Sequence, residues 1–153
     1  MNARLIAGFG GALVLGAIGF TTLAKHDDLC GSRVIARAVN PVDGRIAYTF
    51  IRNCGATTGI LTNIAIGEPT TALEKATVVF TADDSHGKAD RDTASLGAIW
   101  TQVGWTGPRH LSVMYAEQAR VYRSAKRLDG ALISYRTGSV NYPLPPPPPP
   151  ENF

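Results

Sequence analysis

The chain has 153 residues, of which 44% are hydrophobic and 18% are charged. This length allows one domain and little more. The 16 glycines and 10 prolines argue against a helical bundle, and the apolar content argues against global disorder. The formal net charge of +3 comes from basic residues spread along the whole chain, so the charge gives no support for a nucleic-acid partner.

The first segment of the chain predicts a membrane anchor. Leu5–Ala24 is a run of 20 residues without a charge, preceded by Arg4 and followed by Lys25. A spanning helix needs about 20 apolar residues, whereas a cleavable secretory signal has an apolar stretch of about 7–15. Length therefore favours a retained single-pass transmembrane helix and a short linker over residues 1–29. The small-x-small site at Thr22–Ala24 keeps a cleaved signal peptide as the alternative.

Small residues recur along this segment at a spacing of four. Such spacings let two helix backbones approach closely inside a membrane, where lipid removes the hydrophobic drive for association. The expected helix-packing residues are Ala7, Gly8, Gly11, Ala12 and Gly16. Glycine is also common in spanning helices that pack against nothing, so this simpler interpretation stands beside the first.

Two cysteines, Cys30 and Cys54, indicate the compartment of the rest of the chain. An even pair is typical of an exported domain, because disulfides persist in oxidising compartments. A metal site would want two further ligands, and redox pairs favour closer spacing. We therefore expect a structural disulfide and an inner-membrane protein whose C-terminal domain lies in the periplasm. Closing a loop of 25 residues, the disulfide would stabilise the domain by about 3–4 kcal/mol.

Residues 30–136 predict an all-β domain, a small antiparallel meander or a sandwich. Short apolar runs alternate with turn signals such as Asp43-Gly44, Gly107-Pro108 and Asp129-Gly130, and no long 3.6-residue period follows Ala24. The expected strands are Arg33–Val39, Arg45–Arg52, Ile60–Gly67, Ala76–Ala82, Gly97–Val103, His110–Ala116, Arg120–Ser124 and Ala131–Arg136.

The first hairpin has a register that the sequence itself favours. A pairing that sets Cys30 opposite Cys54 also sets Val34 opposite Phe50. The further expected pairs are Ala36 with Tyr48, Ala38 with Ile46 and Val39 with Arg45. Even-numbered positions then form a nearly apolar face, and Arg33, Arg37 and Arg45 lie on the other. A slip of one residue would set the apolar row opposite the arginines, which burial of one face forbids.

Several motifs along this domain occur together in a known group of proteins. Asn40-Pro41-Val42-Asp43-Gly44-Arg45 leads into a strand that ends Cys54-Gly55-Ala56-Thr57-Thr58-Gly59. With Trp100 or Trp105, Leu111–Tyr115 and Leu128–Gly130, the chain resembles an uncharacterised group of small exported bacterial proteins over about residues 30–136. Val42 departs from the group's Pro-Asp-Gly hairpin. The resemblance implies a small exported β domain and brings no activity.

Two stretches carry residues capable of binding a ligand. Cys54–Gly59 holds two hydroxyls between glycines, whose amides could form a small anion-binding concavity, but no lysine follows as in a phosphate loop. Asp83–Asp92 holds four carboxylates and His86, but its spacing does not match a calcium loop. Lys88 and Arg91 can also neutralise these acids. We favour a tight connection for the first stretch and a solvated loop for the second, and expect neither metal nor cofactor.

The residue types of nucleophilic catalysis are present without their usual motifs. His26, His86 and His110 lie in different elements, and none is beside a pattern such as Gly-x-Ser-x-Gly. Spatial triads can form from distant residues, so the sequence merely fails to support catalysis. We expect a protein that is not an enzyme and has no small-molecule substrate.

The C-terminal residues 137–153 form a proline-rich tail. Its six consecutive prolines are Pro145, Pro146, Pro147, Pro148, Pro149 and Pro150. A polyproline II rod of this length reaches about 19 Å and loses little entropy on docking, so it suits a partner's surface. A disordered tail is the simpler alternative.

Together these features favour a non-catalytic accessory subunit. The membrane helix would pack into a larger integral membrane complex, for example a respiratory or photosynthetic one, with the β domain on its periplasmic side and the tail on a neighbour. The alternative is a free-standing periplasmic ligand-binding or envelope module that is released by signal cleavage, with its ligand near Gly55–Gly59 or Asp83–Asp92.

Overall fold

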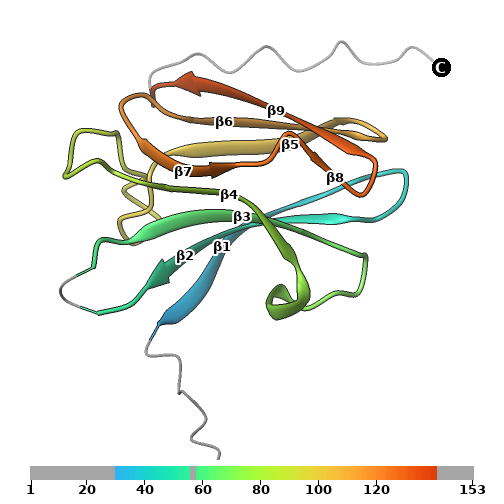
Figure 1. Ribbon diagram of the computed structural model, residues 1–153, viewed down its shortest axis with the longest axis horizontal. Helices are drawn as coiled ribbons and strands as arrows, with labels where there is room; N and C mark the ends of the chain where they lie inside the picture. Colours follow the sequence, from blue (N-terminus) through green and yellow to red (C-terminus); the bar gives the residue numbers. More distant parts are fainter. Residues whose placement is uncertain (1–29, 56–57, 141–153) are drawn as a thin grey trace, which may run out of the picture.

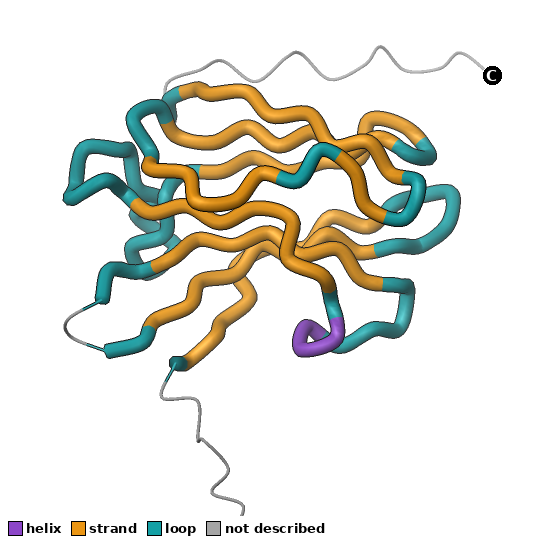
Figure 2. Tube along the Cα trace, viewed as in Figure 1, coloured by secondary structure: helices purple, strands orange, loops and turns teal. Residues whose placement is uncertain are grey.

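The computed structural model describes residues 30–55 and 58–140, which form two packed β-sheets (Figure 1). The strands are β1 (Gly31–Val39), β2 (Ile46–Asn53), β3 (Leu61–Gly67), β4 (Thr77–Asp83), β5 (Thr101–Gly107), β6 (His110–Ala116), β7 (Arg120–Ser124), β8 (Arg127–Leu128) and β9 (Ala131–Gly138). A short 3-10 helix, η1 (Leu73–Lys75), lies in the connection between β3 and β4 (Figure 2). One sheet has the order β1-β2-β3-β4-β7 and the other the order β5-β6-β9-β8.

The predicted all-β class is confirmed within these residues, and the meander is confirmed in part. β1 to β4 follow one another as antiparallel neighbours. The chain then crosses to β5 and β6, returns to pair β7 with β4, and crosses again to β8 and β9. β9 runs parallel to β6, so the expectation of purely antiparallel pairing is wrong in the second sheet.

Seven of the eight predicted strands have ends within two residues of the observed ones. The strand expected over Gly97–Val103 is wrong, because pairing with β6 begins at Thr101 and continues to Gly107. Leu96 and Gly97 both have positive φ and form a turn, and Ile99 makes only an isolated bridge to Arg91. Ala98 and Ile99 are buried although they precede the strand.

The register of the first hairpin is half as expected. Val34 faces Phe50, and the Cys30–Cys54 disulfide is formed, as predicted. Beyond Val34 a β-bulge shifts the pairing by one residue, because Ile35 has no partner on β2. The observed pairs are Ala36 with Thr49, Ala38 with Ala47 and Val39 with Ile46, so the pairs expected there are wrong. The bulge also sets Arg37 opposite Tyr48, with its guanidinium 5.6 Å from the ring centroid.

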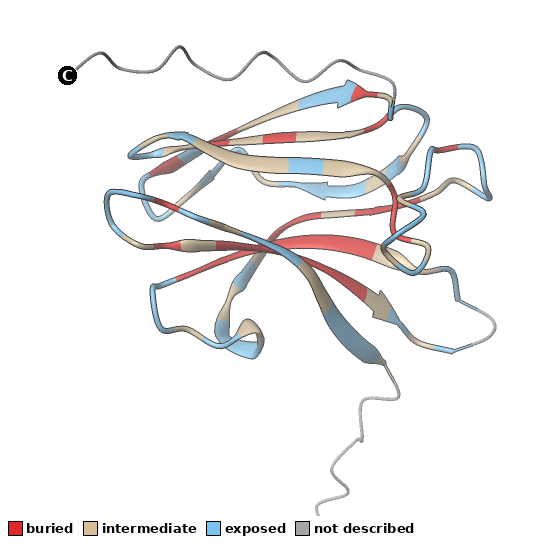
Figure 3. Ribbon diagram, turned by 180° about the vertical axis from the view of Figure 1, so that it is seen from behind, coloured by how far each residue is buried: buried red, intermediate tan, exposed pale blue. Residues whose placement is uncertain are grey.

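The main core fills the space between the two sheets (Figure 3). Phe80 of β4 is fully buried at its centre. Its ring centroid lies 5.0 Å from that of Tyr115 and 5.7 Å from that of Tyr135. Both tyrosines belong to the second sheet, so this aromatic group joins the layers. Aromatic pairs at such distances add about 0.5–1.5 kcal/mol to the free energy of burial.

A second, smaller cluster lies on the other face of the five-stranded sheet. Tyr48, Phe50 and Ala65 are buried there, and Leu73 of η1 packs against them. The Tyr48 hydroxyl donates a hydrogen bond of 2.7 Å to the Thr71 carbonyl oxygen. The connection between β3 and β4 therefore covers this part of the sheet, which explains why β2 is buried on both faces.

Arg45 is buried, although the predicted register placed it on the face opposite the apolar row. Its Nε donates to a carboxylate oxygen of Asp43 at 2.7 Å, and its Nη2 donates to the Pro108 carbonyl oxygen at 3.3 Å. The guanidinium carbon lies 5.2 Å from the centroid of the Trp105 ring. Arg45 does lie on the odd-numbered face, but it is buried there because the β1–β2 turn packs against another turn, which a two-strand register does not include.

The turns at this end of the sandwich are thereby joined to one another. Asn40 donates from its side chain to the same Pro108 carbonyl oxygen at 2.9 Å. Arg45 Nη1 reaches the carbonyl oxygen of Asp129 at 3.5 Å. Asp129 and Gly130 both have positive φ between the paired residues Leu128 and Ala131, the geometry of a two-residue hairpin turn. The predicted Asp129-Gly130 turn is confirmed.

Part of the predicted organisation lies outside the described residues. These include the Leu5–Ala24 segment with its helix-packing residues, and the six prolines of the tail. Between residues 30 and 140, with 56–57 left aside, no helix is long and apolar enough to cross a membrane.

We expect Arg45→Ala to lower the free energy of unfolding by about 1–3 kcal/mol, because it removes a buried side chain that hydrogen-bonds two other turns and packs on the Trp105 ring. Arg109→Ala is the matched control, since Arg109 is exposed on the β5–β6 turn. That control should change the free energy by less than about 0.5 kcal/mol. Chemical denaturation of the two purified variants measures both values, and equal small losses would contradict the role of Arg45.

Candidate functional site

A depression of about 430 Å³ lies where the end of the 54–59 loop meets β3, β4 and β7. Phe80 and Ala82 of β4 belong to the core between the sheets. Because side chains alternate along a strand, Thr81 and Asp83 lie on the opposite, outer face. The lining residues are Cys54, Thr58, Gly59, Leu61, Thr81, Asp83, Arg120 and Tyr122. Apolar and hydroxyl groups thus surround a single carboxylate and a single guanidinium.

Asp83 is the centre of the polar contacts in this depression, and only 6% of the residue is exposed. Arg120 forms an ion pair with it, and the Arg120 Nε donates to Oδ1 at 3.2 Å. The Tyr122 hydroxyl donates to Oδ2 at 2.7 Å, and the Ser85 amide donates to Oδ1 at 2.8 Å. All of these donors converge on one carboxylate, so its charge is well compensated.

These contacts control the ionisation of the group. Burial by itself would raise the pKa of Asp83, but the hydrogen bonds from Arg120, Tyr122 and Ser85 outweigh burial and lower the pKa to about 2. The hydrogen bond to Asp83 raises the pKa values of both Arg120 and Tyr122. Asp83 is therefore a carboxylate at neutral pH, and this group does not suit the role of a general acid.

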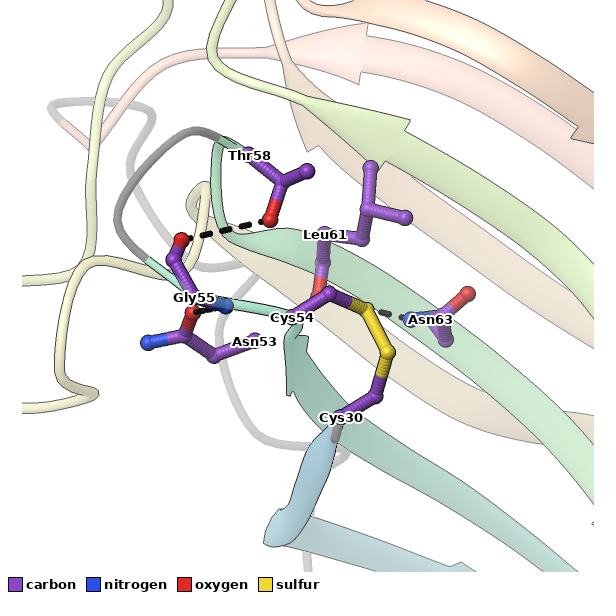
Figure 4. Close-up of a disulfide and its surroundings, with 7 residues drawn as sticks. All are labelled: Cys30, Asn53, Cys54, Gly55, Thr58, Leu61 and Asn63. Atoms are coloured by element: carbon purple, nitrogen blue, oxygen red, sulfur yellow. Dashed lines mark hydrogen bonds between the residues drawn. A yellow bond between two sulfur atoms is a disulfide. The ribbon is translucent and has the colours of Figure 1, made fainter. Parts of the chain in front are cut away.

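The loop beside the depression is held at both of its described ends (Figure 4). The Cys30–Cys54 disulfide joins the start of β1 to the residue that follows β2. The Asn53 side chain accepts a bond of 3.0 Å from the Gly55 amide, and the Thr58 hydroxyl donates to the Gly55 carbonyl oxygen at 3.2 Å. Thr58 thus bonds local backbone, as the simpler interpretation of this stretch predicted.

The fold brings together the two stretches that the sequence marked as ligand candidates. Thr58 and Gly59 of the first stretch and Asp83 of the second line the same depression. The other residues of the acidic stretch do not line the depression, and several of them bond one another. Arg91 pairs with Asp84 through a bond of 2.7 Å from Nε, as expected of a neutralised surface loop. Among the described residues, no three acidic, histidine or cysteine side chains form a group that could hold a metal.

Arg120 and Tyr122 are functional candidates that the sequence did not single out. Both lie in a strand that was predicted, but their link to Asp83 requires β7 to pair with β4 across the intervening β5 and β6. No local pattern reports a pairing over such a distance in the chain. Without that topology, two basic residues and a tyrosine on a short strand do not indicate a functional site.

A histidine and a serine also meet on the second sheet. His110 Nε2 lies 3.0 Å from Ser134 Oγ, because β6 and β9 run parallel in this register. The hydrogen bonds of the described residues join no carboxylate to His110. His86 lies in the turn after β4 with a φ of 62°, and His26 lies outside the described residues.

Comparison of the chain with protein-family models, with curated proteins and with solved structures finds no match. The resemblance over residues 30–136 therefore stays an expectation. The function is argued below from the chain's own residues.

Asp83 gives the stability of the protein a defined dependence on pH. Its pKa of about 2 in the folded state lies below the ordinary value of 3.8, so its contribution is present above about pH 4 and is lost as the pH falls towards 2. The size of this contribution is about 2 kcal/mol. We expect Asp83→Asn to lower the free energy of unfolding at pH 7 and to flatten its dependence between pH 4 and 2.

The matched control for this prediction is Asp90→Asn, at an exposed carboxylate of the following loop. Urea denaturation at several pH values would give the profile of each variant. An Asp83→Asn profile that runs parallel to the wild-type profile would contradict the assignment.

Proposed function

We propose that this protein is a non-catalytic, membrane-anchored accessory subunit that packs on a larger membrane protein complex from its periplasmic side. One observation carries the proposal: the 20 uncharged residues Leu5–Ala24 precede, by a short linker, a β-sandwich whose first residue is already bound in a disulfide. A disulfide supports an oxidising compartment, and the length of the segment supports a retained span.

The architecture of the domain favours attachment over chemistry. Its turns are bound to each other through Arg45, and its layers are joined through Phe80, which supports a domain that keeps its shape when attached to the proposed membrane helix. The charged groups of the depression compensate one another and leave no acid or base set for work near neutral pH. A rigid, stapled domain is suited to holding neighbouring subunits in place.

A free-standing binding module is the second candidate, and the depression beside the 54–59 loop favours it. Its volume of about 430 Å³ is within the range of small-ligand sites. In this case the segment before Lys25 would be a cleaved signal, and the mature protein would be soluble.

Purification of the tagged native protein in mild detergent separates the two candidates. The accessory subunit should be extracted only with detergent and should elute with membrane protein partners in fixed ratio. An untagged strain carrying the same expression background is the control for unspecific capture. Elution as a lone monomer, from membranes or from the soluble fraction, would contradict the proposal.

A second variant tests whether the disulfide serves this role. We expect Cys30→Ser with Cys54→Ser to lower the free energy of unfolding by about 3 kcal/mol, since the two cysteines are 24 positions apart. β1 is an edge strand held on one side only by β2, so it should become the first site of proteolysis. Cleavage elsewhere with β1 intact, or an unchanged denaturation midpoint, would contradict this prediction.

A further inference from the structure

Residues 120–127 contain the densest group of positive charges in the chain. Four of its 15 lysines and arginines lie in these eight residues, which contain no acid. We call them the basic strip, made of Arg120, Arg123, Lys126 and Arg127. Its residues belong to β7, to β8 and to the two residues between them. The excess charge of the chain is therefore locally concentrated, beyond what the overall composition indicates.

Most of this charge is not compensated within the described residues. All four side chains belong to exposed residues. Arg120 is paired with Asp83, whereas no ion pair within residues 30–55 and 58–140 joins Arg123, Lys126 or Arg127 to a carboxylate. Lys126 makes a cation–π contact with Tyr135, in which its Nζ lies 5.0 Å from the ring centroid. Three like charges thus remain open to an anionic partner.

The strip also follows the open edges of both sheets. β7 is the last strand of the five-stranded sheet and β8 is the last strand of the four-stranded sheet. Within the described residues neither strand has a strand partner on its second side. Such an edge can accept an extended peptide through backbone hydrogen bonds.

The crossing between these strands is fixed in place. The Tyr135 hydroxyl donates to the carbonyl oxygens of Val79 at 3.1 Å and of Ala125 at 2.8 Å. Burial raises the pKa of Tyr135 to about 12, so its hydroxyl stays protonated as a donor. The backbone at the centre of the strip is therefore already held in place before a partner binds, which lowers the cost of ordering it.

One end of the strip borders the depression described above. Arg120 and Tyr122 line that depression, and Tyr122 is 56% exposed while its hydroxyl is held by Asp83. The ring is thus presented in a fixed position beside the apolar side chain of Leu61. An apolar residue of a bound peptide can be buried here, next to the charges.

We propose that the basic strip binds an extended acidic segment of a partner polypeptide. This inference rests on the proposed function, because it names the chemistry of the subunit surface on which the domain packs. Acidic side chains pair with Arg123, Lys126 and Arg127, and the peptide backbone pairs with the open edge. A lipid surface would satisfy the charges, but it would use neither the strand edge nor the depression.

Protection of an edge strand is the competing explanation for these charges. Natural sheets place charged side chains on exposed edges to prevent aggregation. β1, the opposite edge of the five-stranded sheet, likewise carries the exposed Arg33 and Arg37. Protection alone would make the two edges equivalent in binding, whereas a docking strip would make only the β7–β8 edge bind.

The test uses the full chain in detergent micelles and a labelled peptide of about eight residues with alternating Glu and Val. Fluorescence anisotropy measures its binding at low and high salt, with the corresponding Lys-Val peptide for comparison. We expect the acidic peptide alone to bind, and raised salt to weaken binding. Arg123→Glu with Arg127→Glu should weaken binding at least about tenfold.

The matched control is Arg33→Glu with Lys75→Glu, which changes the net charge equally at exposed residues away from the strip. It should weaken binding by less than about threefold. Equal losses in both variants, absence of peptide binding, or binding only to vesicles of anionic phospholipid would overturn the inference. Circular dichroism of each variant confirms that it is folded.

The peptide-binding test and the co-purification test can fail independently of each other. If the wild-type protein has no co-purifying partner but binds the acidic peptide at the strip, the proposed function fails and the strip stands. If partners co-purify equally well with the Arg123→Glu, Arg127→Glu variant, only the strip is contradicted.

Discussion

The pairing of β4 with β7 is the constraint on which the candidate site depends. It brings Arg120 and Tyr122 to Asp83, 37 and 39 positions earlier in the chain, and so completes the polar centre of the depression. The same pairing ends the five-stranded sheet and turns the chain towards β8, where Tyr135 fixes the crossing. The depression and the placement of the basic strip along two sheet edges therefore follow from one strand that ends the five-stranded sheet and leads into the other.

Buried polar side chains with hydrogen bonds between distant elements lie around Arg45 and around Asp83 in the described residues. At one end, Arg45 and Asn40 bind three turns together and leave a rigid body. At the β7 edge, Asp83 is surrounded by donors that hold it ionised, and exposed cations continue beyond it. The first arrangement stabilises the fold. The second leaves positive charge at a surface, and the proposed attachment role depends on this charge.

Local patterns in the sequence predicted much of the fold, and long-range pairing explains what they missed. Alternation and turn residues located the strands, and the cysteines with Val34 and Phe50 fixed the start of the first hairpin. The bulge at Ile35 was not predicted, because the alternation of apolar residues along β1 continues through it without a break. The burial of Arg45 and the partners of Asp83 depend on contacts between elements distant in the chain. For the same reason, the sequence marked Cys54–Gly59 and Asp83–Asp92 as separate ligand candidates and did not predict that they line one depression.

The most direct test of the account is the intact mass of the protein extracted from membranes, measured after thiol labelling without reduction. A membrane-anchored subunit with an oxidised domain should have a mass that includes Leu5–Ala24, with no label on Cys30 or Cys54. A soluble species that begins near Lys25, or a membrane species with both cysteines labelled, would contradict the account.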